Sequence, residues 1–327
     1  MSKIKNKCVL VTGGAGFIGS NLCLDLIQEN EVICLDNLMT GKMDNLEGVI
    51  HHSNFRFVEG DIRNTNTVRE VMYGVDVVLH QAALGSVPRS INNPLLTNSV
   101  NIEGFLTVIN EAVKANVNRF VYAASSSTYG DHPGLPKVED EIGKPLSPYA
   151  VTKYVNELYA DVFSKLHGIE TIGLRYFNVF GRNQDPNGAY AAAIPKFIKA
   201  FIDYHAPVIN GDGSQTRDFT YIDNVIQANN LAGTVNEKDA LNHVYNVAFG
   251  ATITLNDLIE KVKDLLVGYD PEISKVNPIF GPDRKGDVKH SFASIDKAKE
   301  KLNYDPQFSL ELGLEKAIEW YWNYFKA

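Results

Sequence analysis

The feature of the sequence that most constrains the fold is a glycine-rich turn close to its start. Gly13, Gly16 and Gly19 have the spacing G-x-x-G-x-x-G and follow an apolar segment at residues 8–12. A run typical of a helix, residues 20–28, comes next, and a second apolar segment, residues 31–35, ends at Asp36. Strand, glycine turn, helix and strand within about 30 residues form the unit that dinucleotide-binding folds require.

The same alternation continues through the first half of the chain. Short apolar segments that indicate strands lie at residues 55–58, 75–80, 119–124 and 170–174, and runs with helical spacing lie at residues 101–115 and 149–166. Strands that alternate with helices indicate a parallel sheet covered by helices on both faces. We therefore predict an α/β fold built on a Rossmann-type, doubly wound parallel sheet.

The pattern becomes irregular after about residue 178. Residues 183–191 are rich in Gly, Asn and Pro and predict a loop over a site. The remaining segments predict helices at residues 194–204, 223–231, 255–266 and 310–325 and short strands at residues 208–211 and 219–221. We predict a dinucleotide-binding domain over residues 1–178 and a smaller mixed α/β substrate domain over residues 179–327, interleaved with the first.

The glycine turn and the strand ends predict how a cofactor binds. Gly13 permits the tight turn, Gly16 lets the backbone approach a pyrophosphate, and Gly19 allows close contact between helix and sheet. The N-terminus of the following helix then faces the phosphates. The Asp36 carboxylate suits a free ribose 2′-hydroxyl and repels a 2′-phosphate, which favours NAD over NADP. Asp61, also at a strand end, is a candidate for the adenine pocket, with a helix cap as the alternative.

A second motif, Tyr149 followed four residues later by Lys153, lies in a predicted helix, so both side chains share one face. An ammonium beside a phenol stabilises the tyrosinate. To act as a base near neutral pH, the phenol pKa must fall from about 10 by roughly 3 units, which is about 4 kcal/mol. We expect Lys153, a bound cofactor cation and partial desolvation to supply this together. The alternative for the pair alone is a solvated helix face.

Composition excludes several classes of function for this 327-residue chain. The formal net charge of -8 argues against non-specific nucleic-acid binding. The three cysteines, Cys8, Cys23 and Cys34, lie in apolar segments and indicate buried thiols of a reducing compartment, and no metal site is expected. The sequence contains no run of 18 apolar residues, so no membrane span is expected. No secretory segment precedes the first strand. We expect a cytoplasmic protein.

Together these motifs resemble the extended short-chain dehydrogenase/reductase family over nearly the whole chain. The resemblance rests on the glycine turn, Asp36, Asp61-Ile62, the serine run before Tyr129-Gly130, Tyr149-x-x-x-Lys153 and Arg175-Tyr176-Phe177-Asn178. Within that family the chain is similar to the nucleotide-sugar 4-epimerases. Residues 82–89, 125–132 and 175–190 resemble the bacterial UDP-N-acetylglucosamine 4-epimerases of surface-polysaccharide pathways.

The resemblance implies a reversible epimerisation at C4 of a UDP-sugar through a 4-keto intermediate, with NAD retained. Tyr149 as phenolate takes the proton from the sugar 4-hydroxyl, Ser125 orients the 4-oxygen, and Lys153 lowers the phenol pKa and binds the nicotinamide ribose. Arg217 and Arg284 pair with the phosphates, because guanidinium groups suit diphosphate oxygens.

The implied site is larger than these residues. The cofactor contacts come from Gly13, Gly16, Phe17, Ile18, Gly19, Asp36, Asn37, Asp61, Ile62, Ala82, Tyr149, Lys153 and Tyr176. The substrate contacts come from Gly85, Ser86, Ser125, Ser126, Ser127, Tyr149, Asn178, Ala192, Asn210, Arg217, Arg284 and Ser291. The family also suggests a homodimer through the helices near residues 101–115 and 149–166.

The substrate prediction depends on Ser291. Epimerases restricted to UDP-glucose and UDP-galactose resemble this chain but have a Tyr at the matching position, whose ring fills the space of a C2 acetamido group. We therefore predict interconversion of UDP-N-acetylglucosamine and UDP-N-acetylgalactosamine, with UDP-glucose and UDP-galactose as weaker substrates. A UDP-glucuronate 4-epimerase is the main alternative. A dehydratase would need a carboxylate at Ser126 or Ser127, and an NAD-binding redox sensor would lack Tyr149 or Lys153.

Overall fold

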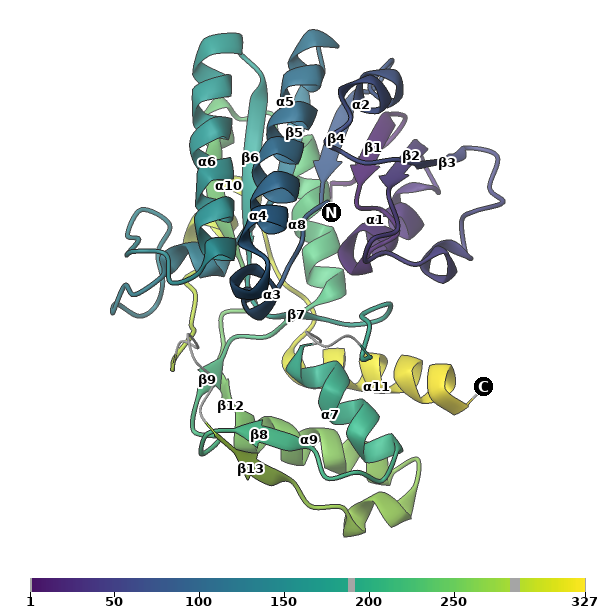
Figure 1. Cartoon of the computed structure of the whole chain (residues 1–327), viewed down its shortest axis with the longest axis vertical. Coiled ribbons are helices and arrows are strands. Elements are labelled where there is room, and N and C mark those ends of the chain that lie inside the picture. The colour runs from purple at the N-terminus through teal and green to yellow at the C-terminus, as the bar shows by residue number, and fades with distance from the viewer. Residues whose placement is uncertain (1, 188–191, 283–288, 327) are drawn as a thin grey trace.

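A seven-stranded parallel sheet lies at the centre of the computed structural model, which describes residues 2–187, 192–282 and 289–326 (Figure 1). The strand order is β11-β6-β5-β4-β1-β2-β3, and every neighbouring pair is parallel. The strands are β1 (Cys8–Thr12), β2 (Glu31–Asp36), β3 (Phe55–Glu59), β4 (Val77–His80), β5 (Arg119–Ser125), β6 (Glu170–Tyr176) and β11 (His243–Val247). The predicted doubly wound α/β fold is confirmed.

Helices cover both faces of the sheet because successive strand residues point to opposite sides and both sides are apolar. Val9 and Val11 of β1 belong to the core shared with α1 and α8, whereas Leu10 belongs to the core shared with α2 and α5. The helices around the sheet are α1 (Phe17–Leu26), α2 (Thr65–Val71), α3 (Val87–Asn92), α4 (Pro94–Asn98), α5 (Gly104–Lys114), α6 (Pro148–His167) and α8 (Ile222–Thr234).

The three helices that the sequence predicted in the first half each begin earlier than expected. Helix α1 begins at Phe17 rather than residue 20, because Gly16 already takes the N-cap position. The predicted helix at residues 101–115 begins as a π-helical turn, Ser99–Glu103, and continues as α5. Helix α6 starts at Pro148, one residue before the predicted start, because Ser147 caps it by accepting a hydrogen bond from the Ala150 N–H at 3.2 Å.

The second half of the chain forms a smaller α/β region at one end of the sheet (Figure 1). Its strands pair two by two, β7 with β10, β9 with β12 and β8 with β13. The elements are β7 (Val179–Phe180), α7 (Ala193–Ile202), β8 (Val208–Asn210), β9 (Thr216–Arg217), β10 (Thr220–Tyr221), β12 (Ile253–Thr254), α9 (Leu255–Val267), β13 (Ile279–Gly281) and α11 (Leu310–Lys326). Helix α10 (Asp296–Leu302) instead packs beside the sheet, against β11 and α8. Strand β11, which the sequence analysis did not predict, returns the chain to the sheet beside β6.

One continuous apolar core joins the smaller region to the sheet. The cluster that contains Val9 and Val11 extends through Phe201 of α7 and Val262 of α9 to Ile318 of α11, all of which are buried. This shared core fixes the residues of the smaller region relative to the carboxyl ends of the strands.

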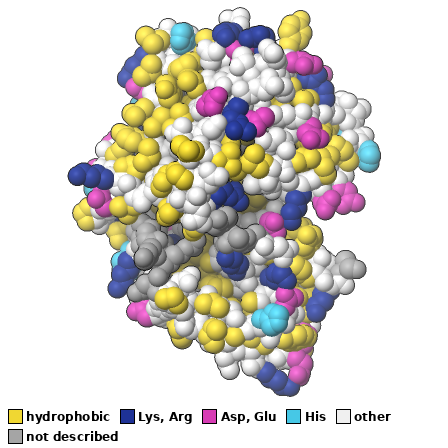
Figure 2. Space-filling view, in the orientation of Figure 1, with side chains coloured by type: hydrophobic (Ala, Val, Ile, Leu, Met, Phe, Trp, Pro, Cys, Tyr) yellow, Lys and Arg dark blue, Asp and Glu magenta, His cyan; other side chains and the backbone are white. Residues whose placement is uncertain are grey.

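Helix α6 presents an exposed apolar stripe on its outer side. Its members are Val151, Leu158, Val162 and Leu166, which are 46%, 49%, 45% and 72% exposed. Their spacing of seven, four and four residues places them on one face. Figure 2 shows hydrophobic side chains gathered over this helix.

Neither a spanning helix nor a metal cluster is found among the residues that the structure describes. Over residues 2–187, 192–282 and 289–326, no helix is long and apolar enough to cross a bilayer, and no three His, Cys, Asp or Glu side chains are grouped to hold a metal. Cys23 and Cys34 are buried, Cys8 is half-buried, and all three are free thiols.

Candidate active site

The glycine turn leads from β1 into α1 at the centre of the sheet. Gly13 has φ +70°, and a Cβ added to it would lie 2.7 Å from the Ala82 Cα. A Cβ on Gly19 would lie only 2.1 Å from the Gly13 carbonyl oxygen. The turn therefore admits no side chain at either position, and it brings backbone close to the end of β4 at the start of a helix. This is the cradle that a pyrophosphate needs.

A cavity of about 290 Å³ opens over this turn, between the carboxyl ends of β1 and β4. Parallel sheets of this order bind ligands at that point, where the strand order reverses. The predicted residues that line it are Gly13, Gly16, Phe17, Ile18, Gly19, Asp36, Asn37, Ile62, Ala82 and Gly85. Gln81 also lines it and was missed, although its position directly after β4 was a usable signal.

Asp36 lies in the wall of this cavity with its carboxylate fixed by backbone. Its oxygens accept hydrogen bonds from the Leu38 N–H at 2.8 Å and the Ala15 N–H at 3.0 Å. Burial raises the pKa of Asp36, and these hydrogen bonds oppose the rise. The result is an immobile acceptor at the end of β2, which suits a sugar hydroxyl.

The Asp61 carboxylate is hydrogen-bonded to neighbouring side chains of this chain and does not line the cavity. Arg63 donates to both of its oxygens, at 2.9 and 2.6 Å, and Asn37 donates at 3.0 Å. The Arg63 guanidinium holds the pKa of Asp61 at about 2. The alternative role as a helix cap is wrong, because Asn64 caps α2 by accepting from two backbone N–H groups. Of the predicted adenine-pocket segment, Ile62 is the residue that lines the cavity.

Tyr149 and Lys153 lie one turn apart on α6. The Lys153 Nζ is 6.0 Å from the centre of the Tyr149 ring and donates a hydrogen bond to the Ala123 carbonyl oxygen of β5 at 2.8 Å. Lys153 is 3% exposed. The predicted pair is therefore assembled on one face, but the ammonium is directed at the sheet.

The pKa values of the pair differ from the prediction. Burial raises the pKa of Tyr149, and only the Ser125 hydroxyl opposes the rise. Burial lowers the pKa of Lys153 to about 8, against the opposing charge of Glu157. The lowered phenol pKa that a base requires is thus not found in the protein alone, because desolvation disfavours the charge on both groups. The pairing of Glu157 with Arg175, at 2.8 and 2.9 Å, further weakens its effect on Lys153.

Two of the three predicted serines form a hydrogen-bonded chain toward the phenol. Ser125 ends β5 and is 8% exposed. The Ser127 hydroxyl donates to the Ser125 oxygen at 2.9 Å, and the Ser127 N–H donates to the same oxygen at 3.1 Å. Ser125 therefore keeps its own hydrogen for Tyr149, whose pKa its hydrogen bond lowers. Ser126 is half-buried at the start of the following turn.

A buried residue that the sequence analysis missed supports this site. Asn101 lies in the π-helical turn, accepts from the Leu84 N–H at 2.7 Å and donates to the Thr152 hydroxyl at 3.0 Å. Leu84 lines the cofactor cavity, and Thr152 precedes Lys153. Asn101 therefore links the wall of the cofactor cavity to α6 by hydrogen bonds. An isolated Asn in an apolar helical run gave no usable signal.

Tyr176, another predicted cofactor residue, is held at the end of β6. Its hydroxyl donates to Gln81 at 3.1 Å and accepts from the Asn229 amide at 3.0 Å. Burial raises the pKa of Tyr176 to about 12.

Ser86, a predicted substrate residue, is the N-cap of α3 and has φ +96°. Its hydroxyl accepts a hydrogen bond from the Arg89 N–H at 3.3 Å.

A second cavity, of about 570 Å³, lies in the smaller region, among β7, α7, β8 and β9. Four predicted substrate residues line it together, Asn178, Ala192, Asn210 and Arg217. Asn178 has φ +37° and donates to the Asp218 carbonyl oxygen at 2.8 Å. Lys196 of α7 also lines this cavity and was not predicted.

The segment that contains Ser291 runs beside β9. The Ser291 N–H donates to the Thr216 carbonyl oxygen at 3.1 Å, and Arg217 donates to the Lys289 carbonyl oxygen at 3.1 Å. Ser291 thus lies next to the strand that carries Arg217. Arg284, the other predicted phosphate residue, lies outside the described residues.

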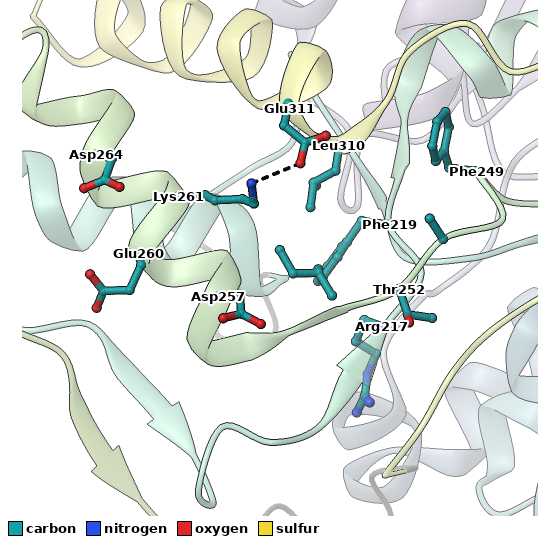
Figure 3. A pocket seen from close by; sticks show the side chains of 12 residues that line it. Arg217, Phe219, Phe249, Thr252, Asp257, Glu260, Lys261, Asp264, Leu310 and Glu311 are labelled. Carbon is teal, nitrogen blue, oxygen red and sulfur yellow. Dashed lines mark ion pairs between the residues drawn. The ribbon is translucent and has the colours of Figure 1, made fainter.

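A third cavity, of about 490 Å³, lies on the other side of Arg217 and Phe219, which line both cavities. Figure 3 shows it bounded by Phe249 and by acidic residues of α9. Lys261 and Glu311 pair across its edge at 3.1 Å.

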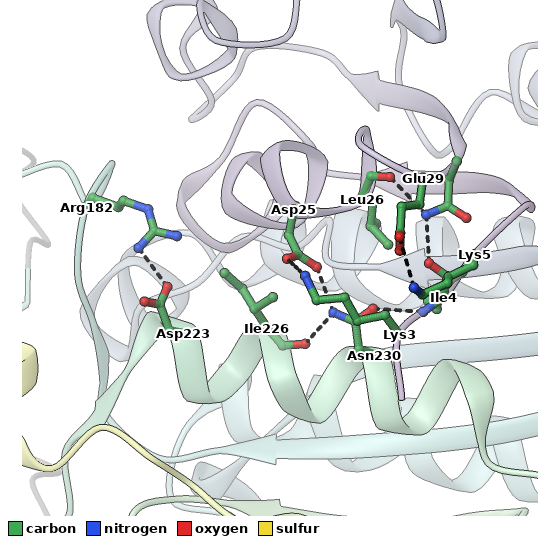
Figure 4. Close-up of polar contacts among 11 residues, drawn as sticks. Lys3, Ile4, Lys5, Asp25, Leu26, Glu29, Arg182, Asp223, Ile226 and Asn230 are labelled. Carbon is green, nitrogen blue, oxygen red and sulfur yellow. Dashed lines mark hydrogen bonds and ion pairs between the residues drawn. The ribbon is translucent and has the colours of Figure 1, made fainter. Parts of the chain in front are cut away.

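A fourth cavity, of about 390 Å³, is bordered by polar groups that pair with one another (Figure 4). Lys3 pairs with Asp25 at 2.6 Å, and Asn230 of α8 donates to the same carboxylate at 2.8 Å. Arg182 pairs with Asp223 at 2.7 Å. These contacts hold the N-terminal segment and α8 against α1, the helix that follows the glycine turn.

A switch-point cavity over a glycine turn, with a Tyr/Lys pair and a serine at the end of β5, defines a dinucleotide-dependent enzyme of the short-chain dehydrogenase/reductase class. The chain belongs to the NAD-dependent epimerase/dehydratase family, whose profile matches residues 9–248.

Three similar proteins are all sugar-nucleotide epimerases by name. A putative UDP-glucose 4-epimerase of Methanocaldococcus jannaschii is 37% identical over 95% of this chain and 97% of its own length. The structure of a UDP-N-acetylglucosamine 4-epimerase from Methanobrevibacter ruminantium, in complex with UDP-N-acetylmuramic acid, is 38% identical with a TM-score of 0.92 and covers 98% of this chain and 100% of its own. A Bacillus cereus UDP-glucuronic acid 4-epimerase with bound UDP-glucuronic acid and NAD is 31% identical, with a TM-score of 0.87 over 97% and 99%.

Proposed function

We propose that this protein interconverts UDP-N-acetylglucosamine and UDP-N-acetylgalactosamine by epimerisation at C4, with UDP-glucose and UDP-galactose as weaker substrates. The observation that carries the proposal is the small side chain of Ser291 on the segment beside Arg217. A hydroxymethyl group there leaves room for a C2 acetamido group. The similarity to the Methanobrevibacter ruminantium epimerase supports the same substrate class.

Tyr149 is the proposed acid/base. Its phenolate removes the proton of the sugar 4-hydroxyl and returns it after the sugar has turned. Ser125 orients the 4-oxygen, and Ser127 fixes Ser125 through the 2.9 Å hydrogen bond between their hydroxyls. Ser126 and Ser127 provide no carboxylate to eliminate water, which favours epimerisation over dehydration.

The residues of the first cavity fit NAD. The glycine turn leaves the backbone exposed where an added Cβ would clash, and it meets a helix N-terminus. Gly13 and Gly16 would hold the pyrophosphate, Asp36 the adenosine ribose, and Lys153 the nicotinamide ribose. Bound NAD supplies the hydride acceptor and donor for C4.

Arg217, Asn178 and Asn210 are the proposed ligands of the nucleotide diphosphate and uridine, with Ala192 in the same wall. Their common place in the 570 Å³ cavity supports this assignment. A fork of guanidinium N–H groups from Arg217 matches diphosphate oxygens. We assign the same role to Arg284 from the sequence resemblance.

A panel of UDP-sugars tests the proposal. Purified protein is incubated with UDP-N-acetylglucosamine, UDP-glucose and UDP-glucuronate, and the products are identified by NMR. The expected result is fastest conversion of the acetylated sugar to its C4 epimer. Exclusive conversion of UDP-glucuronate would replace the proposal with a UDP-glucuronate 4-epimerase, and a 4-keto-6-deoxy product would reveal a dehydratase.

A further inference from the structure

Asp218 is a fully buried carboxylate in the wall between two cavities. It lies between β9 and β10, is 0% exposed, and is flanked by Arg217 and Phe219, which both line the nucleotide-sugar cavity and the cavity of Figure 3. A buried charge is costly unless hydrogen bonds satisfy it, so its partners indicate its role.

Those partners are backbone N–H groups from two other segments. Phe249 donates to one carboxylate oxygen at 3.2 Å, and Gly250 donates to both, at 3.3 and 3.2 Å. Ala251 and Ala293 add backbone hydrogen bonds. Three consecutive N–H groups form a nest of the kind that binds anions, and here the nest holds the carboxylate of the protein itself. Gly250 has φ +85°, a conformation that favours glycine.

Three residues of the nucleotide-sugar site lie next to Asp218. Arg217 precedes it, Ser291 lies two residues before Ala293, and Asn178 donates to its backbone carbonyl oxygen at 2.8 Å. Loss of the carboxylate would release the segments at residues 249–251 and 291–293 from β9, while the Asn178 contact, which is made to the backbone, would remain.

We propose that Asp218 is a positioning residue of the nucleotide-sugar site, whose carboxylate holds the loop at residues 249–251 and the segment at residues 291–293 against β9. Arg217 and Ser291 are thereby set in place for the diphosphate and the sugar. This inference rests on the proposed function and adds a residue that does not itself touch the substrate.

The ionisation of Asp218 predicts the direction in which affinity for a UDP-sugar changes with pH, and this direction distinguishes the proposed role. Burial raises the pKa of Asp218 to about 7, and the N–H donors oppose the rise. Below that pH the neutral carboxyl holds its donors less strongly, so affinity for a UDP-sugar should fall. The charged or titratable side chains on the segments next to it are Arg217 of β9, Tyr221 of β10, Lys289, His290 and Tyr304. The imidazole of His290 is hydrogen-bonded with the Thr216 hydroxyl at 3.0 Å, so a substitution of His290 separates its contribution from that of Asp218.

The test measures binding of UDP-N-acetylglucosamine to the NAD-loaded protein by calorimetry, one pH unit below and one above the Asp218 pKa. We expect the wild type to bind several-fold more weakly at the lower pH. Asp218→Asn should weaken binding about tenfold or more at the higher pH, the scale of one hydrogen bond to a charged group, and remove the pH dependence. In turnover, KM should rise far more than kcat falls. Asp239→Asn, an exposed carboxylate of the same half, is the control and should match the wild type.

The outcomes distinguish a failure of the role proposed for Asp218 from a failure of the proposed function. Wild-type binding that is independent of pH, or an Asn variant that binds as the wild type does, overturns the role of Asp218. If Asp218→Asn does not fold, the wild-type profile compared with that of His290→Gln decides, since the expected fall at low pH must persist without the imidazole. A wild-type protein that binds no UDP-sugar at either pH rejects the proposed function itself.

Discussion

Burial shifts the pKa values of Tyr149 and Lys153 in opposite directions, and both shifts favour the neutral forms. The phenol therefore stays protonated near neutral pH in the protein alone. The Ser125 hydroxyl stabilises the anion there through its hydrogen bond. The spacing of the Tyr/Lys pair predicts that the two side chains share a helix face, but it does not predict their pKa values, because the depth of burial is a property of the fold.

Replacing Tyr149 with Phe tests its role in proton transfer. The variant should lose at least roughly two orders of magnitude in turnover, the usual contribution of an acid/base group, while it keeps its NAD. Tyr154→Phe on the same helix serves as the control and should retain activity. An active Tyr149→Phe enzyme would remove Tyr149 from the mechanism.

The raised phenol pKa predicts a titration that needs no turnover. Because burial raises the pKa of Tyr149, the NAD-free protein should form its tyrosinate only above the ordinary value of about 10. The ultraviolet difference between wild type and Tyr149→Phe, followed against pH, isolates this ionisation. Loading with NAD should move it to lower pH by roughly 3 units if the phenolate is the base. A midpoint near neutrality in the NAD-free protein contradicts the assignment of the shift to burial.

Ser291→Tyr tests the basis of substrate choice. The ring should fill the space of the acetamido group and exclude it by a clash, which costs more than one lost contact. Turnover of UDP-N-acetylglucosamine should fall by about 100-fold or more, and UDP-glucose should remain a substrate. Ser291→Ala, which adds no bulk, should leave the ratio of the two rates unchanged. An unaltered ratio in the Tyr variant would assign specificity to other residues.

At the scale of elements, the sequence predicted those parts of the fold whose neighbours in space are neighbours in the chain. Each strand from β1 to β5 is followed by a helical segment before the next strand of the sheet, and the order of such strands in a doubly wound sheet follows known rules. Strand β11 escaped prediction because it pairs with β6 from about 70 residues away, across an irregular region.

Residues whose type alone suggests a chemistry, such as Gly19 and Lys153, could be proposed for the site from the sequence. Residues whose position in the fold decides their role could not. Asn101 acts through a π-helical turn, and Asp218 acts through backbone donors of two distant segments. Neither a local period nor a spacing encodes these contacts.

The glycine turn gives a prediction at this scale. In Gly19→Ala the added methyl would meet the Gly13 carbonyl oxygen at 2.1 Å, so α1 must move away from β1. The purified variant should contain little or no NAD, whereas the wild type should retain it, and absorbance and mass analysis of the released nucleotide measure both. In Gly268→Ala the methyl lies 3.2 Å from Leu265, outside the cavity, and NAD should be retained. Full NAD content in Gly19→Ala would show that close packing of the turn is dispensable.

At the scale of the whole molecule, one cavity that serves the proposed reaction lies at the carboxyl ends of β1 and β4 and the other lies in the smaller region, and both are away from the outer face of α6. That outer face carries the apolar stripe of Val151, Leu158, Val162 and Leu166. A soluble chain rarely leaves such a row in water unless it binds something, and a helix face that pairs with its own copy forms a closed, two-fold contact. The stripe and the cavities of the proposed reaction thus lie on separate surfaces.

We predict that the protein is a homodimer through this stripe and the adjoining α5. Leu158→Glu would place a carboxylate at the centre of the contact, where removing its hydration costs several kcal/mol, so the variant should sediment as a monomer while the wild type sediments as a dimer. Ile279→Glu is a matched control, because Ile279 of β13 is also about half exposed, at 52%, but lies in the smaller region. It should leave the dimer intact. A wild type that sediments as a monomer over a wide range of concentration, or a Leu158→Glu protein that remains dimeric, would exclude α6 as the interface.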